Sequence, residues 1–185
     1  TAMKRRYLNH FAAAVTFTAA CALTGCAHDD HDLDDCVRCA SWADVSTAIC
    51  AIRPTAGNAT TGMVTFIDVE GGVRVRAQIS GLKPNARHGF HIHEFGYCGS
   101  DDATCTGGHY DPGKSGHHAL PGGAKAHPAG DMGNLVADSR GNASYDAVIK
   151  GISIAGRNAI IGRAVIIHAQ PDDGGQPTGN AGARI

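Results

Sequence analysis

The most informative feature of this sequence is a set of histidines whose spacing suits the binding of transition metals. His91 and His93 stand two residues apart in a β-branched and aromatic run. Alternate residues of a strand point to the same face, so a strand here would aim both imidazoles at one point. More candidate ligands follow along the chain: His109, His117, His118, His127, Asp131 and His168. Together these side chains are numerous enough to hold two metal ions.

Short strands and turns are expected to position these ligands. The 185 residues suffice for one domain plus a tail, and 25 of them are glycine. Apolar stretches with a helical period are scarce beyond the N-terminus, which favours strands. The net charge of −1 gives no reason to expect a nucleic-acid partner. The predicted strands are residues 47–53, 61–69, 72–80, 88–95, 133–138, 143–149 and 163–168.

Two long connections separate the later strands. They run over residues 96–131 and 169–183, and the first is dense in His, Asp, Cys and Gly. Loops of this length without secondary structure are usually functional or disordered. Regularly spaced short strands with such loops predict an all-β, antiparallel Greek-key barrel or sandwich of the immunoglobulin-like kind.

The N-terminus has the pattern of an export signal. Residues 3–6 (MKRR) are basic and residues 11–23 are small or apolar. Residues 23–26 (LTGC) look like a bacterial lipobox, which predicts a signal peptide over 1–26 and lipid attachment to Cys26; a plain signal peptide is the alternative. We therefore expect an exported, periplasmic or cell-envelope lipoprotein that meets the membrane only through its lipid anchor.

Residues 27–46 are polar and acidic, and they contain the tract HDDHD at 28–32. Such a composition is typical of a flexible tether between a lipid and a domain. The tract is interpreted either as a solvated spacer or as a loose metal-binding segment. The folded domain is expected over residues 47–185.

Five sequence blocks resemble the copper/zinc superoxide dismutase family. The likeness covers the chain from about residue 47 to its C-terminal end. The blocks are residues 88–96 (HGFHIHEFG), 108–112 (GHYDP), 130–134 (GDMGN), 160–163 (IIGR) leading to His168, and 178–184 (TGNAGAR).

The resemblance implies the metals and their ligands. The copper ligands would be His91, His93, His109 and His168. The zinc ligands would be His109, as an imidazolate shared with copper, and His118, His127 and Asp131. A closed zinc site of this kind suits a structural role, whereas copper must keep an accessible face.

The zinc loop presents a choice and a departure from the family pattern. The family has a zinc histidine three residues before a proline; His118 fits this pattern, with Pro121, and His117 is interpreted as its exposed neighbour. The family usually has two residues between its last zinc histidine and the aspartate. Three residues separate His127 from Asp131 here, which predicts altered or weakened zinc geometry.

Two C-terminal residues acquire roles through the resemblance. Asp172 matches the carboxylate that bridges a copper histidine and a zinc histidine, here His91 and His118. Arg184 matches the arginine that draws in and orients the superoxide anion. The loop 169–183 contains no Lys, so Arg184 is expected to carry most of the attraction; Lys114 and Lys125 are further candidates.

The implied reaction is dismutation of superoxide to oxygen and hydrogen peroxide. Copper would alternate between Cu(II) and Cu(I), and His109 would carry a proton between half-reactions while staying on zinc. Copper and zinc are thus the expected cofactors, and Arg184 and His109 the catalytic residues.

The sequence does not decide the disulfide pairing or the oligomeric state. The family's bridge partner lies a few residues past the arginine, and this sequence stops at Ile185, so the last strand is expected to be truncated. Either Cys98 pairs locally with Cys105, or one of these loop cysteines lacks its partner. Residues 95–96 and 161–162 resemble the dimer contacts of animal enzymes, and both a homodimer and a monomer are compatible with the sequence.

Two further classes of function compete with the enzyme. One is a metal-sequestering domain without turnover, which the His/Asp tract would suit. The other is a structural envelope lipoprotein on the same fold. The complete set of copper histidines together with Arg184 favours the enzyme.

Overall fold

Seven strands and one short 3-10 helix are formed by the residues that the computed structural model describes, namely 45–96, 99–122 and 126–185. The strands are β1 (Thr47–Ile52), β2 (Thr61–Val69), β3 (Gly72–Ser80), β4 (Arg87–His93), β5 (Asp131–Val136), β6 (Ala143–Ile149) and β7 (Ala164–Ile167). The helix is η3 (Thr104–Thr106). No helix in these ranges is long and apolar enough to cross a membrane.

The strands form where the sequence predicts them. β2, β3 and β6 have the predicted bounds; β1 differs by one residue at its end, and β4, β5 and β7 differ by one or two residues at both ends. The physical basis is alternation, since Val73, Val75, Ala77 and Ile79 of β3 are buried while residues between them face outward. The all-β prediction is confirmed.

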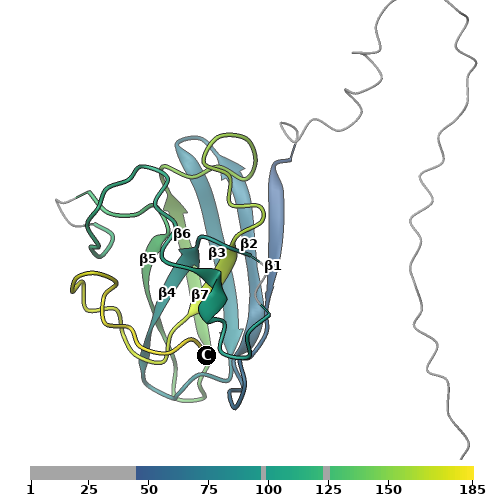
Figure 1. Cartoon of the computed structure of the whole chain (residues 1–185). Helices are drawn as coiled ribbons and strands as arrows, with labels where there is room; N and C mark the ends of the chain where they lie inside the picture. Colours follow the sequence, from purple (N-terminus) through teal and green to yellow (C-terminus); the bar gives the residue numbers. More distant parts are fainter. Residues whose placement is uncertain (1–44, 97–98, 123–125) are drawn as a thin grey trace, which may run out of the picture. The chain divides into compact units, whose positions relative to one another are not determined.

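Two antiparallel sheets stack on each other (Figure 1). One has the strand order β1-β2-β3-β6 and the other β5-β4-β7. The chain changes sheets between β3 and β4, between β5 and β6, where β6 returns beside β3, and between β6 and β7. This is a Greek-key arrangement, as the sequence predicts. The sheets meet in an apolar core, where the Phe90 ring on β4 packs edge-on against Tyr145 on β6, 5.1 Å between centroids.

Strand β4 places the metal-binding histidines. It is the middle strand of its sheet, and the six residues from His88 to His93 are buried. Phe90 and Ile92 belong to the apolar core, so the alternating His91 and His93 face the other side. In Figure 1 the two long loops, the teal-to-green one after β4 and the yellow one after β7, lie along this sheet. His91 and His93 are both buried.

Close approach of the C-terminal loop depends on a glycine in β4. A Cβ at Gly89 would lie 2.8 Å from Cβ of Ala181 and 3.1 Å from Cε1 of His91. Real Cβ atoms essentially never approach another atom as closely as the first of these distances, so a larger residue at Gly89 would displace the loop at Ala181. β4 also changes its register with β5 between Gly89 and His91.

Several predictions fall outside the described residues. These are the signal peptide over 1–26, the lipid attachment at Cys26, residues 27–44 of the tether, Cys98 and Lys125. They stay predictions. The first described strand begins at Thr47.

Candidate metal centre

Four histidines gather on the outer side of β4. His91 and His93 come from β4 itself, His109 from the loop after it, and His168 from the end of β7. One ring nitrogen from each lies within 4.8 Å of the corresponding atom of the others. The strand-borne pair and His168 are almost fully buried. Distant parts of the sequence thus converge on one point that could hold a metal ion.

Hydrogen bonds fix which ring nitrogen each histidine presents. Nδ1 of His93 donates to the carbonyl of Gly107 at 2.9 Å, and Nδ1 of His168 donates to that of Gly182 at 2.9 Å. Their Nε2 atoms are therefore the free lone pairs, and they lie 3.4 Å apart. His91 is reversed, because its Nε2 bonds Oδ2 of Asp172 at 2.8 Å and its Nδ1 is free. Backbone carbonyls and one carboxylate thus pre-orient the ring nitrogens for a shared ion.

Burial keeps these imidazoles neutral. Loss of hydration lowers the pKa of His93 to about 2, and nearby His109, His168 and Arg184 add to the effect. The same cause, burial first, lowers the pKa of His168 to about 4 and also lowers the pKa of His91. A neutral imidazole keeps the lone pair that a metal needs.

A second group shares His109 with the first. It consists of His109, His118 and Asp131, whose ligand atoms again lie within 4.8 Å of one another. Nδ1 of His109 lies 2.6 Å from Oδ1 of Asp131, so its Nε2 is the atom turned toward the four-histidine group. Nδ1 of His118 faces Oδ2 of Asp131 at 2.8 Å. The bridging position of His109 is the geometry that a shared imidazole requires.

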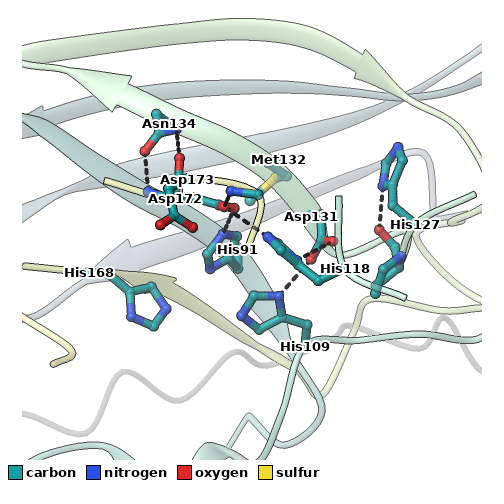
Figure 2. A network of polar contacts seen from close by, with 12 residues as sticks. His91, His109, His118, His127, Asp131, Met132, Asn134, His168, Asp172 and Asp173 are labelled. Atoms are coloured by element: carbon teal, nitrogen blue, oxygen red, sulfur yellow. Dashed lines mark hydrogen bonds and ion pairs between the residues drawn. The ribbon is translucent and has the colours of Figure 1, made fainter. Parts of the chain in front are cut away.

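Asp172 joins the two groups from behind (Figure 2). Its Oδ2 accepts from His91 and its Oδ1 accepts from Nε2 of His118, each at 2.8 Å. Burial opposes its charge most strongly, yet hydrogen bonds from both histidines and from the amide of Gly174 together lower the pKa of Asp172. The carboxylate therefore stays ionised and holds one histidine of each group in a fixed tautomer.

The two remaining zinc-loop histidines lie away from this centre. His117 is exposed. His127 is half-buried, and its Nδ1 donates to the carbonyl of Pro128 at 2.9 Å. Figure 2 shows its ring set apart from His118 and Asp131. The structure thus brings seven of the eight predicted residues together and leaves His127 outside. Six of the seven form the two ligand groups, and Asp172 bonds one histidine of each group.

A pocket of about 260 Å³ opens beside the four-histidine group. His93, His109, His168 and Arg184 line it. Nη2 of Arg184 donates to the carbonyl of Gly107 at 2.7 Å, which holds the guanidinium at the wall. Lys114 is not among the described residues that line this pocket, and Lys125 lies outside the described part of the chain.

Several residues that support the site were not found from the sequence. The carbonyl of Gly107 serves both His93 and Arg184. The Asn134 side chain holds the backbone of Asp172 from both sides, with bonds of 2.7 and 2.9 Å. Asn134 lies within the GDMGN block, which is the one signal that pointed to it. The side-chain amide of Gln176 likewise accepts a hydrogen bond from the backbone amide of His118 and donates one to its carbonyl.

The chemistry of the buried atoms tests whether metals fit. Nδ1 of His91 is buried and has no hydrogen-bond partner among the described residues. Nδ1 of His118 and Oδ2 of Asp131 are also buried, and they face each other at 2.8 Å without forming a hydrogen bond. Buried polar atoms without partners are costly, so three of them at the two groups call for a cation. Four imidazoles suit copper, and two imidazoles with a carboxylate suit zinc.

The fold and the site together define a class of protein. A two-layer β-sandwich with two neighbouring groups of metal ligands beside its strand β4, joined through the imidazole of His109, is the architecture of a dinuclear metalloprotein. Comparison with known proteins gives the particular family. The family model described as copper/zinc superoxide dismutase (SODC) matches residues 60–185. The chain belongs to the copper/zinc superoxide dismutase family.

Individual relatives agree with this assignment. Superoxide dismutase [Cu-Zn] of Paramecium bursaria Chlorella virus 1 is 40% identical over 131 residues, which cover 67% of this chain and 68% of the relative. Superoxide dismutase [Cu-Zn] 3 of Arabidopsis thaliana is 40% identical over 136 residues, covering 69% and 80%. The crystal structure of the clock protein EA4 superimposes with a TM-score of 0.66 at 37% identity, covering 76% of this chain and 90% of that one.

Proposed function

We propose that the four-histidine group, His109 in its bridging position and Arg184 form the active site of a copper/zinc superoxide dismutase. The observation that carries the proposal is the convergence of His91, His93, His109 and His168 beside a pocket that Arg184 also lines. As an enzyme of this family, the protein converts superoxide and protons to oxygen and hydrogen peroxide, with copper and zinc as cofactors.

Bound copper supplies the one-electron redox chemistry, and bound zinc supplies a fixed positive charge. The residues of the chain bind, orient and protonate around them. Arg184 attracts the superoxide anion into the pocket, and its bond to Gly107 restricts where the guanidinium can point. The buried neutral imidazoles of His93 and His168 would hold copper without adding charge of their own.

His109 is placed to move a proton. Its Nδ1 is engaged on the Asp131 side, so its Nε2 is the atom that faces the pocket-side group. A proton held on Nε2 lies beside the position where the anion enters, because His109 also lines the pocket. The imidazole can therefore deliver a proton to the product and be recharged from solvent.

We also propose the export and anchoring that the N-terminal sequence favours. A lipid on Cys26 and the polar tether of residues 27–46 would hold the enzyme at the periplasmic or outer face of the cell envelope. The support is the basic and apolar pattern that precedes LTGC. A Cys26→Ser variant that stays in the membrane fraction would contradict it.

Two finer features complete the proposal. A bridge between Cys98 and Cys105 is supported by the reversal of the chain near it, since Oγ of Ser100 lies 3.3 Å from Sγ of Cys105. Association as a homodimer is supported by two exposed apolar side chains on adjoining segments: Phe95 is 57% and Ile161 38% exposed, and the amide of Gly96 bonds the carbonyl of Gly162 at 2.8 Å.

The decisive experiment compares a bridging with a non-bridging histidine. The full chain, loaded with copper and zinc, is assayed for superoxide removal next to His109→Ala and His117→Ala, with metal content read on the same samples. We expect fast turnover in the wild type and in His117→Ala, which changes an exposed side chain. We expect its loss in His109→Ala. Bound metal without turnover in the wild type would instead indicate sequestration.

A further inference from the structure

His127 is held outside the group that would bind zinc. Its Nδ1 bonds the carbonyl of the next residue, Pro128, at 2.9 Å. The ring lines a separate pocket of about 500 Å³ together with Asp111 and Lys150. The atoms of His109, His118 and Asp131 converge without it. The zinc group therefore has three members in this structure, and none of them requires His127.

The chain after His127 explains this position. The extra residue relative to the family pattern is taken up in a turn, in which the amide of Asp131 bonds the carbonyl of Pro128 at 3.0 Å. Proline also restricts the backbone of the residue before it, here His127, to extended conformations. Figure 2 shows the His127 ring apart from His118 and Asp131, with its Nδ1 bonded to the carbonyl of Pro128.

The turn itself is fixed against the core. The amide of Gly130 donates to the carbonyl of Tyr110 at 2.9 Å, and its carbonyl accepts from the amide of Ile92 on β4 at 2.9 Å. A Cβ at Gly130 would lie 2.5 Å from the carbonyl oxygen of Ile92. Moving the turn to bring His127 inward would break these buried bonds.

We infer, on the basis of the proposed function, that three side chains of this protein hold zinc: His109, His118 and Asp131. The fourth position is left to water or another small ligand, and His127 does not bind the ion. Sites with three protein ligands and one exchangeable ligand are an established form of zinc coordination. The zinc half of this centre would thus be open, whereas the family pattern predicts a closed one.

Zinc affinity of matched histidine variants tests the inference. The copper-loaded, zinc-free full chain is titrated with zinc against a chromophoric chelator, as wild type and as His127→Ala, His118→Ala and His117→Ala. We expect the affinities of His127→Ala and His117→Ala to stay within about threefold of the wild type. We expect His118→Ala to lose at least about a hundredfold. A loss in His127→Ala comparable to that in His118→Ala would overturn the inference.

A second measurement observes zinc binding on the wild-type chain. Imidazole nitrogen resonances are recorded on the full chain before and after zinc is added, with copper kept as Cu(I) so that the sample is diamagnetic. Zinc should shift the signals of His109 and His118 and leave those of His127 in place, with the variants providing the assignments. Ligand-like shifts of His127, or no zinc-dependent shift of His118, would overturn the inference.

Dismutation measured on the same samples separates the two proposals. A chain that holds zinc without His127 but does not remove superoxide would contradict the proposed function alone. A chain that removes superoxide but needs His127 for zinc would contradict the present inference alone.

Discussion

Replacing Gly179 with alanine should damage the metal centre from a distance in sequence. Gly179 has a φ of +73°, and a Cβ there would lie 2.6 Å from Nε2 of His118 and even closer to the Asp172 carboxylate. That carboxylate and that nitrogen form the buried 2.8 Å bond between the two metal groups. The added methyl group would push them apart, because the buried surroundings offer no room to move.

The size of the effect follows from two separable costs. Alanine at a left-handed φ costs about 1 kcal/mol. Loss of a hydrogen bond to a buried charged group costs about 1.5–3 kcal/mol more. Gly174 provides the matched control, since its φ is +77° in the same loop but a Cβ there would meet Leu120 no closer than 3.6 Å. Gly174→Ala should therefore show the backbone cost alone.

Chemical denaturation of the metal-free chain measures both variants. We expect Gly179→Ala to lower the free energy of unfolding by about 1.5–3 kcal/mol more than Gly174→Ala does. Because the lost bond orients His118, zinc affinity should also fall about 10- to 100-fold in Gly179→Ala. Equal destabilisation by the two alanines, with unchanged zinc affinity in both, would refute the argument that Gly179 protects this bond.

Three further predictions concern charge. Arg184 and the exposed Asp102 line the same pocket, and hydrogen bonds from the amide and hydroxyl of Thr104 lower the pKa of Asp102 to about 2, so it is anionic at neutral pH. Arg184→Gln should slow superoxide removal about tenfold, and the rate of the variant should fall less steeply with rising salt concentration than that of the wild type. Asp102→Asn should speed it about twofold, the effect of one charge at about 10 Å in water; a slower Asp102→Asn enzyme would contradict this. The metal-free chain should lose stability as pH falls from 6.5 toward 4, because burial lowers the pKa of His168 to about 4 while the unfolded histidine protonates near 6.5. Thermal unfolding should show a loss of about 2 kcal/mol for this group by pH 5, and a melting temperature that rises on acidification would contradict it.

Most of the fold could be predicted because each strand is marked by a pattern in its own local sequence. Alternating burial gives each strand its period, and glycines at the turns, such as Gly71 and Gly72 where the chain passes from β2 into β3, mark the strand ends. The bounds of β4 and β5 were less accurate. Their ends run into the two long loops, and tertiary contacts rather than alternation decide where pairing stops there.

The ligand types, their order and the family could also be derived from the sequence. The choice of His118 over His117 rested on the spacing to Pro121, and the structure buries His118 and exposes its neighbour. The roles of Asn134, Gln176 and Gly179 could not be derived in this way. Each acts on a residue more than 35 positions away, and no local pattern records such a contact.

The sequence by itself therefore determined the strands, the metals and nearly all the side chains that would bind them, since these depend on residue type and local spacing. The tertiary structure decided which nitrogen each histidine presents, how Asp172 joins the two groups, and where His127 lies. Those outcomes depend on hydrogen bonds between distant segments. The extra residue before Asp131 is visible in the sequence, but its effect is set by the bonds that fix Gly130 against β4.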